Sequence, residues 1–197
     1  EGQPGRLAGA IIAAQRPAPP KHPALVMFHK QQFPAPLSVQ QSLRGKRILL
    51  IGFTGFIGKV WLEHLLRGVP DVAKVYLLIR RQRSTSARRR FEKIVEESPV
   101  FDALEQQHGA GLTEFLSAKI EVVEGDVSQP GLGLEPELRA QLAATLDLVL
   151  NSAGLTDFNP DLRDALSSNI DSAVHLVDFL RESDHAALMH LSTCYVV

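Results

Sequence analysis

The sequence predicts an α/β fold in which a parallel sheet is covered by helices on both faces. Two observations predict it: short, continuous apolar runs recur from residue 47 onward, and longer amphipathic segments lie between them. Continuous apolar runs are typical of strands that are buried on both faces. Strands that alternate with helices are joined by right-handed crossovers, which make neighbouring strands parallel. The chain has 197 residues, 45% hydrophobic and 22% charged, which is ordinary for a globular domain with one full core.

Residues 1–42 precede this pattern and are expected to form an arm or linker. The segment QRPAPPKHPALVMFHKQQFPAPL has six prolines among its 23 residues. Proline fixes φ and lacks an N–H donor, which excludes a regular helix or a central strand. We therefore divide the chain into a proline-rich arm, residues 1–42, and a domain, residues 43–197. Because the chain ends within a predicted strand, we expect this domain to be incomplete and to lack a C-terminal substrate part.

Five strands and four well-marked helices are expected in the domain. The strands fall within residues 47–52, 73–79, 118–127, 147–154 and 187–197. The helices fall within residues 56–69, 80–98, 135–146 and 161–183, with a more variable helical stretch before residue 118. The expected strand order is 3-2-1-4-5, a doubly wound parallel sheet, or Rossmann fold, truncated after about the fifth strand.

Three glycines, Gly52, Gly55 and Gly58, stand between the first strand and the helix that follows it. Backbone N–H groups at the start of a helix are unpaired and, together with the helix dipole, form a site for anions. Gly52 would let the turn close, Gly55 would leave room for a pyrophosphate against the backbone, and Gly58 would let the helix pack closely on the strand. The spacing is Gly-x-x-Gly-x-x-Gly, the variant used by short-chain dehydrogenases. Its place between strand and helix favours dinucleotide binding over an ordinary turn.

The end of the second strand indicates which dinucleotide is bound. An acidic residue about 20 positions beyond the glycines would bind the ribose 2′-hydroxyl of NAD. Here Arg80 and Arg81 follow the strand, 22 and 23 residues beyond Gly58, and no carboxylate occupies that place. A guanidinium matches a 2′-phosphate in charge and in bidentate geometry, so the sequence favours NADPH, with Arg80 as the stronger candidate.

The arginines after Arg80 leave two interpretations open. They can contribute to the cofactor site, or they can form a solvated basic face; this applies to Arg81, Arg83, Arg88, Arg89 and Arg90. A nucleic-acid site is not expected, because no aromatic residues are interleaved with them and the formal net charge of the chain is −1.

Two further strand ends complete the expected cofactor site. Asp126 and Val127 follow the third strand, where an aspartate can bond the adenine amino group while its apolar neighbour packs on the ring. Ser152, Ala153 and Gly154 end the fourth strand with small residues, which a nucleotide lying close to the backbone needs. Ordinary strand termination would explain either set alone. Ligands of doubly wound sheets bind at the carboxyl ends of the strands, so both sets together favour a site there.

Several classes of function are not indicated. The lone cysteine, Cys194, excludes a disulfide framework and a zinc cluster and favours a reducing compartment, so we expect a cytoplasmic protein. The histidines show no ligand-like spacing, and we expect no metal site. The apolar stretch LAGAIIAA is too short to span a bilayer, and we expect no transmembrane segment.

A series of motifs resembles a known family. GFTGFIGKVWLEHLL, VYLLIRR, SPVFDAL, KIEVVEGDVSQPGLGL, LVLNSAGLTDF, SSNIDSAVHLVDF and HLSTCYVV occur in this order from about Leu43 to the end. Together they resemble the N-terminal NAD(P)-binding region of fatty acyl-CoA reductases, the male-sterility type of extended short-chain dehydrogenase/reductase. SPVFDAL and GDVSQPGLGL are the motifs most specific to this branch. The resemblance implies that NADPH reduces a fatty acyl-CoA thioester to an aldehyde and, in a second step, to an alcohol.

The resemblance also implies roles for single residues. The pyrophosphate turn would comprise Gly52, Thr54, Gly55, Phe56, Ile57 and Gly58. Arg80 would meet the 2′-phosphate and Asp126 the adenine, with Ser152, Ala153 and Gly154 along the cofactor and Asn169 in the helix behind the site. Thr193, with Ser192 beside it, corresponds to the catalytic Ser/Thr of the family; a strand-end hydroxyl bonded to backbone is the alternative.

The chain departs from the family in one major way. The Tyr-x-x-x-Lys motif, whose tyrosine would protonate the developing alkoxide, does not occur, so we expect cofactor binding without appreciable turnover by this chain alone. Gly154 and Asp157 also depart from the common pattern, where alanine and a basic residue are usual. Three other functions stay open: a carrier-protein thioester reductase, a nucleotide-sugar epimerase or dehydratase of the extended short-chain type, and a non-catalytic nucleotide-binding module.

Overall fold

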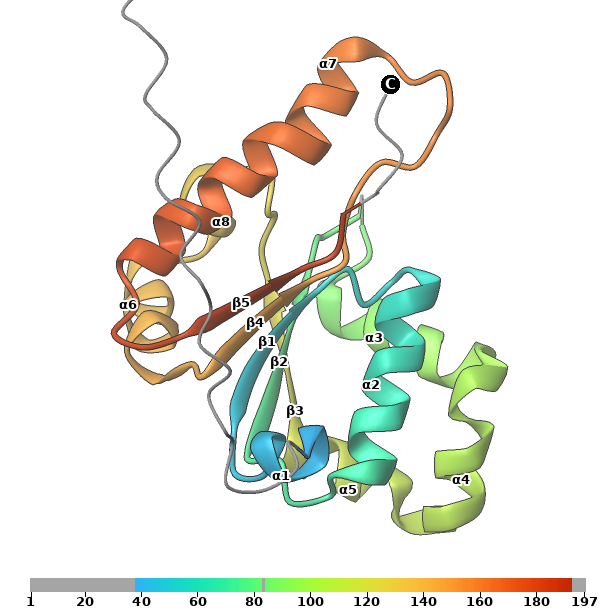
Figure 1. Ribbon diagram of the computed structural model, residues 1–197. Helices are drawn as coiled ribbons and strands as arrows, with labels where there is room; N and C mark the ends of the chain where they lie inside the picture. Colours follow the sequence, from blue (N-terminus) through green and yellow to red (C-terminus); the bar gives the residue numbers. More distant parts are fainter. Residues whose placement is uncertain (1–37, 83, 193–197) are drawn as a thin grey trace, which may run out of the picture. The chain divides into compact units, whose positions relative to one another are not determined.

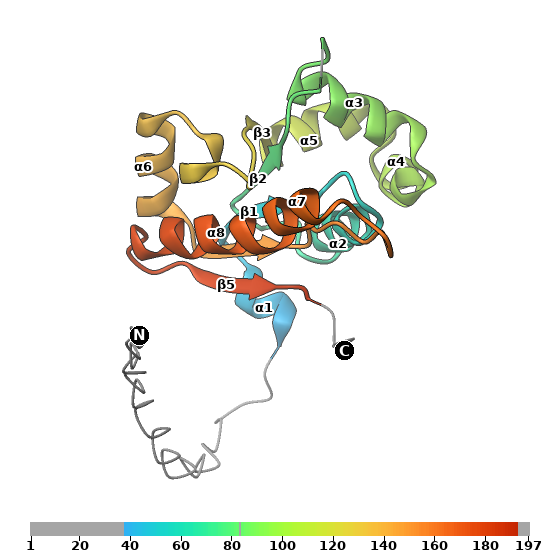
Figure 2. The ribbon, with the colours of Figure 1, turned by 90° about the horizontal axis from the view of Figure 1, so that it is seen from above.

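The computed structural model describes residues 38–82 and 84–192, which form one five-stranded sheet with helices on both faces (Figure 1). The strands are β1 (Arg47–Ile51), β2 (Lys74–Ile79), β3 (Ile120–Glu124), β4 (Leu148–Asn151) and β5 (Ala187–His190). Their order is β3-β2-β1-β4-β5 and every neighbouring pair is parallel. The predicted doubly wound α/β fold is therefore confirmed, and Figure 2 shows β5 at the end of the sheet opposite β3.

The helices form two layers. The described elements are α1 (Val39–Leu43), α2 (Phe56–Gly68), α3 (Ala87–Glu97), α4 (Asp102–His108), α5 (Leu112–Lys119), α6 (Pro136–Thr145), α7 (Leu162–Ala165) and α8 (Ser172–Arg181). Short 3₁₀ turns, η1 (Pro99–Phe101), η2 (Gly109–Gly111) and η3 (Pro130–Gly133), and a π-helical segment, η4 (Leu166–Asp171), join them. Helices α2 to α5 cover one face of the sheet, and α6 and α8 cover the other.

Alternation along β1 explains why the sheet needs both layers. Ile48 and Leu50 pack into the core with α2 and α3, whereas Leu49 and Ile51 pack into the core with α6 and α8. All four side chains are at most 2% exposed. Successive side chains of a strand point to opposite faces, so a continuous apolar run is buried only when both faces are covered.

Two predicted helices differ from the expectation at their boundaries. The helix expected within residues 80–98 begins at Ala87, because Ser86 caps it: its Oγ accepts the Arg89 N–H at 3.3 Å. The bridge between Gln82 and Thr85 turns the chain before that cap. The helix expected within residues 161–183 is interrupted by η4, so that α7 and α8 are separated by a π-helical segment. The predicted arm lies outside the described residues up to residue 37, and α1 follows Ser38.

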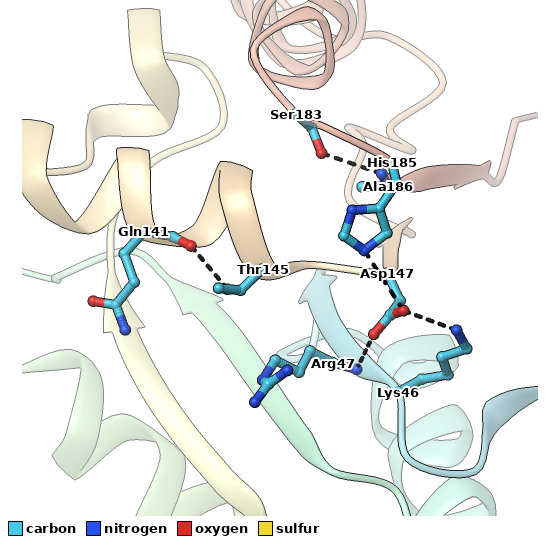
Figure 3. Close-up of polar contacts among 8 residues, drawn as sticks. All are labelled: Lys46, Arg47, Gln141, Thr145, Asp147, Ser183, His185 and Ala186. Atoms are coloured by element: carbon cyan, nitrogen blue, oxygen red, sulfur yellow. Dashed lines mark hydrogen bonds and ion pairs between the residues drawn. The ribbon is translucent and has the colours of Figure 1, made fainter.

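The starts of β1, β4 and β5 are joined by one residue, Asp147, whose carboxylate contacts are drawn in Figure 3. It accepts hydrogen bonds from the Lys46 ammonium and from the Arg47 backbone N–H, both at 2.8 Å. His185 Nε2 lies 3.7 Å from the same carboxylate, and the Ala187 N–H donates to the Asp147 carbonyl at 2.9 Å. Asp147 therefore links three strands at the end of the sheet opposite their carboxyl termini.

One side of the fold is apolar and uncovered within the described residues. All four residues of β5 are exposed, and among the described strands β5 pairs with β4 alone. An apolar stripe runs along α7, η4 and α8 beside it, formed by Leu162, Leu166, Ile170, Val174 and Val177, each more than 40% exposed. Contiguous exposed apolar surface of this kind marks a place where further protein or another surface packs.

Candidate functional site

A cavity of about 330 Å³ opens at the carboxyl end of the sheet. The ends of β1, β2, β3 and β4 contribute to it, together with one residue of α3 and one of η4. It is lined by Ile51, Gly52, Phe53, Thr54, Gly55, Leu78, Ile79, Arg80, Arg90, Gly125, Asp126, Val127, Ser128, Ser152, Ala153, Gly154, Leu155 and Ser168. The structure thus brings together segments that are up to 117 positions apart in the sequence, at the place where doubly wound sheets bind their ligands.

The glycine turn forms one wall of this cavity. Gly52 has a φ of +91°, and a Cβ there would lie 2.6 Å from both the Ala153 nitrogen and the Ser152 Oγ. At Gly58 a Cβ would lie 2.7 Å from the Phe53 Cα. Gly52 is therefore required because the glycine turn after β1 lies close to the loop that follows β4. Gly58 is required because α2 packs closely on the backbone of that turn.

Gly55 has a different environment. A Cβ there would meet only the Gly52 carbonyl oxygen, at the ordinary contact distance of 3.4 Å. The chain itself therefore does not need a glycine at this position. The space beside Gly55 belongs to the cavity, and a side chain would fill part of the room that a ligand needs.

Helix α2 begins at the cavity with unpaired donors. Gly55 is its N-cap residue and supplies no side-chain acceptor, and no acidic residue lies in the first turn. The first N–H that donates within the helix is that of Lys59, to Gly55 O at 3.2 Å. The N–H groups of the first turn and the helix dipole can therefore receive an anion. The side chains of Phe56 and Ile57 are exposed and lie outside the cavity lining, so these residues would act through their backbone.

Two guanidinium groups lie at the end of β2. Arg80 lines the cavity, and its Nη1 is 3.6 Å from Asp126 Oδ2. Arg90, on α3, lines the same cavity and donates a hydrogen bond to the Arg80 carbonyl. The side chain of Arg80 is 72% exposed, so its ion pair with Asp126 leaves the guanidinium free to meet a second anion.

Arg81 points elsewhere. Its Nη1 lies 3.6 Å from Glu124 Oε1, and it is not among the residues that line the cavity. Glu124 also accepts the Ala87 N–H at 3.2 Å and so holds the start of α3. For both Arg81 and Arg90 the sequence left a cofactor site and a solvated face open; of the two, only Arg90 lines the cavity.

The loop after β3 fixes the Asp126 carboxylate. Asp126 Oδ1 accepts hydrogen bonds from the Ser128 N–H at 3.0 Å and from the Ser128 Oγ at 2.7 Å. The other oxygen, Oδ2, is the one that faces Arg80. Val127 lies beside Asp126 in the cavity lining.

The loop after β4 is held from behind by Asn169. The Asn169 Oδ1 accepts the Leu155 N–H at 2.8 Å, and its Nδ2 donates to the Leu155 carbonyl at 3.1 Å. Asn169 lies in η4, and π-helical segments of this kind are frequent at functional sites. Ser152, Ala153 and Gly154, which this loop presents, all line the cavity, while Asn169 itself does not. Its position behind the site agrees with the expectation.

The predicted catalytic pair is described only in part. Ser192 is exposed, two residues beyond β5, and the Leu191 N–H donates to the Asn151 carbonyl at 2.9 Å. Thr193 lies outside the described residues. Asn151 is fully buried and joins its side chain to His190 of β5, with 3.1 Å between Asn151 Nδ2 and His190 Nδ1.

The sequence left Arg90 open and missed several other residues of the cavity: Phe53, Ser128, Leu155 and Ser168. Two of them carried a signal. Ser128 follows Asp126 by two positions, the spacing at which a serine can bond a preceding aspartate. Phe53 lies within the glycine turn and packs on Phe91 of α3, with 5.5 Å between ring centroids.

Comparison with known proteins identifies the family. The profile of the male sterility protein family, an NAD-binding family, matches residues 50–197. The chain belongs to the male sterility protein family. As a member of this NAD-binding family, it is assigned a nicotinamide dinucleotide as its cofactor.

Relatives of this male sterility family member include enzymes of known name. It is 34% identical over 161 residues to "Fatty acyl-CoA reductase 2, chloroplastic" of Arabidopsis thaliana, covering 81% of this chain and 26% of that protein. It is 33% identical over 160 residues to "Fatty acyl-CoA reductase 1" of Gallus gallus, covering 81% of this chain and 30% of that protein. The chain thus spans between a quarter and a third of the length of these relatives. Since one of them is named as chloroplastic, a cytoplasmic location stays a prediction.

Two solved structures similar to this family member are reductase domains. The terminal R domain of the myxalamid PKS-NRPS pathway is 26% identical with a TM-score of 0.61, over 75% of this chain and 35% of that chain. The R domain of a nonribosomal peptide synthetase from Mycobacterium tuberculosis is 28% identical with a TM-score of 0.61, over 76% of this chain and 33% of that chain.

The part of the chain that the structure describes contains neither a membrane-spanning helix nor a cluster of metal ligands. Within it, no helix combines the length and the apolar character that crossing a membrane requires. Among the same residues, no three or more histidine, cysteine, aspartate or glutamate side chains are grouped as metal ligands would be.

Proposed function

We propose that this chain is the NADPH-binding part of a reductase that converts a fatty acyl-CoA thioester to a fatty aldehyde and, in a second reduction, to an alcohol. The observation that carries the proposal is the cavity at the end of β1 and β2, where the unpaired start of α2 and two guanidinium groups line one space. The names of the relatives supply the substrate class, a fatty acyl-CoA.

The residues of the cavity fit a phosphorylated dinucleotide. The N–H groups of Thr54, Phe56, Ile57 and Gly58 would bind the pyrophosphate, since the space beside Gly55 is open to a ligand. Arg80 and Arg90 would bind the 2′-phosphate, and Asp126 and Val127 would bind the adenine. Ser152, Ala153 and Gly154 would lie along the nicotinamide half, on a loop that Asn169 holds from behind.

Bound NADPH would supply the hydride that the thioester carbonyl receives. Thr193, with Ser192 beside it, would donate a hydrogen bond to the carbonyl oxygen as negative charge develops there. The acyl pocket and the groups that complete proton transfer would come from other parts of the longer protein. The uncovered stripe of α7, η4 and α8, together with the exposed strand β5, supports this division, because it offers an apolar surface for them.

A second function has its own support. Two solved structures of similar fold are reductase domains, one from a PKS-NRPS pathway and one from a nonribosomal peptide synthetase. A carrier-protein thioester would suit the same cofactor site, because the thioester carbonyl and the hydride chemistry are the same. Kinetics of the full-length protein with acyl-CoA and with an acylated carrier protein separate the two.

Replacing Arg80 by alanine is expected to weaken NADPH binding about tenfold and leave NADH binding unchanged, because a hydrogen bond between charged groups contributes about 1.5 kcal/mol or more. Arg90→Ala is expected to act in the same direction. Calorimetric titration of the chain with both dinucleotides measures the two dissociation constants.

Arg88→Ala is the control for this prediction. Arg88 is one of the same arginine run, but it pairs with Glu92 at 2.7 Å and lies outside the cavity. Arg88→Ala should leave the dissociation constants for NADPH and NADH unchanged. Arg81→Ala distinguishes the two interpretations of Arg81, because only a residue of the cofactor site should change the constant for NADPH. Equal affinity of the unmutated chain for NADPH and NADH would remove the assignment of NADPH.

A further inference from the structure

The turn η3, Pro130–Gly133, contains three consecutive residues with positive φ. Gly131, Leu132 and Gly133 all have left-handed φ values, +62°, +61° and +61°. Leu132 is the only non-glycine with positive φ among residues 38–82 and 84–192. An L-residue with a Cβ is disfavoured in this region, so the surrounding structure must hold Leu132 there.

The backbone of this turn returns to Asp126. The Leu132 carbonyl accepts the Asp126 N–H at 2.8 Å, and the Leu132 N–H donates to the Gln129 carbonyl at 3.0 Å. The Gln129 N–H in turn donates to the Asp126 carbonyl at 2.9 Å. Both backbone polar groups of Asp126 are therefore bonded within the loop that Leu132 closes.

The same carbonyl explains a glycine of the cavity wall. A Cβ at Gly125 would lie 2.7 Å from the Leu132 oxygen, so the turn sits directly against the backbone that precedes Asp126. A Cβ at Gly133 would lie 3.0 Å from the Asp126 nitrogen, on the other side of the turn. The left-handed backbone thus brings the loop closer to Asp126 than side chains at these positions would permit.

The side chain of Leu132 anchors the turn in the core. It is fully buried in the cluster between the sheet, α6 and α8, which includes Leu142, Leu176 and Phe179. The turn η3 packs against α8. Leu132 therefore connects the core on one side with Asp126 on the other.

We propose that Leu132 is a positioning residue for the adenosine half of the cofactor. Its buried side chain and left-handed backbone fix the Asp126 backbone, and Ser128 fixes the Asp126 carboxylate, so that Oδ2 is aimed into the cavity beside Arg80. The inference rests on the proposed function, since it assigns the role of Leu132 within the same cofactor site.

Leu132→Ala tests the proposal by titration with NADPH and with 2′,5′-ADP, the adenosine half alone. We expect both dissociation constants to rise by the same factor, about tenfold, because the lost contact acts on the half that the two ligands share. In an Asp126→Ala background, Leu132→Ala is expected to change either constant by less than about twofold, since residues that act through one another are not additive.

Leu142→Ala is the matched control. Leu142 is fully buried in the same cluster, but it belongs to α6 and does not line the cavity. It should lower thermal stability comparably and leave both dissociation constants unchanged, which separates positioning from a general loss of packing. Leu132→Met should restore binding to near that of the unmutated chain.

Each result has a distinct meaning. Equal weakening by Leu132→Ala and Leu142→Ala, or independent effects of Leu132→Ala and Asp126→Ala, would overturn the inference and leave the proposed function intact. Failure of the unmutated chain to bind either ligand would overturn the proposed function together with the inference. If Leu132→Ala does not fold, Gly133→Ala replaces it: it should weaken both ligands through the Asp126 nitrogen, and unchanged constants would overturn the inference.

Discussion

Gly52→Ala is expected to lower the free energy of unfolding by about 3 kcal/mol and to abolish cofactor binding. Two effects combine at this position. An alanine at a φ of +91° is disfavoured by about 1–2 kcal/mol. Its Cβ would also lie 2.6 Å from the Ala153 nitrogen and the Ser152 Oγ, and overpacking of this kind costs typically 1–3 kcal/mol. Urea unfolding followed by circular dichroism measures the loss.

Two other glycines separate the effects. Gly45 also has a positive φ, +66°, but a Cβ there meets nothing within 4 Å, so Gly45→Ala should lose only about 1 kcal/mol. Gly58→Ala introduces the close contact with the Phe53 backbone without the unfavourable φ. If Gly52→Ala and Gly45→Ala prove equally stable, the β4 loop does not approach the glycine turn as closely as the structure describes.

The fold could be predicted from the sequence because its elements are strongly patterned. The apolar run of β1 alternates its side chains between two cores, and no arrangement other than a covered sheet buries all of them. The strand order followed from the doubly wound arrangement that alternating strands and helices predict. The starts of helices were less predictable. Ser86 caps α3, but the residues before it are equally polar, so the sequence does not single out Ser86 as the cap.

The site could be predicted only where its residues end a strand. Arg80 and Ser152 directly follow β2 and β4, and Asp126 is the second residue after β3. Parallel strands bring their carboxyl ends to one edge of the sheet. Arg90 could not be assigned in this way, because it reaches the cavity from within helix α3 and not from the end of a strand. In the sequence Leu132 resembles an ordinary core residue. Its distinguishing feature is a positive φ, which the sequence does not show apart from the glycines on either side of it.

At the opposite end of the sheet, the tertiary structure determines the hydrogen bonds and the pKa of the Asp147 carboxyl. In the sequence it is an ordinary polar residue before a strand, yet three strands meet at its side chain and carbonyl. Burial alone would raise the pKa of its carboxyl, but the hydrogen bonds from the Arg47 N–H and the Lys46 ammonium outweigh burial, and the pKa is lowered from its ordinary value of 3.8. His185 adds a further positive charge at 3.7 Å when it is protonated.

Asp147→Asn is expected to lower the free energy of unfolding by about 2 kcal/mol at neutral pH, because hydrogen bonds to a charged group contribute about 1.5–3 kcal/mol. The contribution of a carboxyl whose pKa is lowered by folding is fully present above its unfolded value, 3.8, and is lost as the pH falls below it. The stability of the unmutated chain should therefore approach that of the variant as the pH is lowered below about 4.

Asp71→Asn is the control. Asp71 pairs with Arg44 at 3.4 Å with both side chains more than half exposed, so the substitution should lower the free energy of unfolding by less than about 0.5 kcal/mol. A difference between Asp147→Asn and the unmutated chain that stays constant from neutral pH to pH 3 would contradict this account, because the lost energy would then not depend on the carboxylate charge.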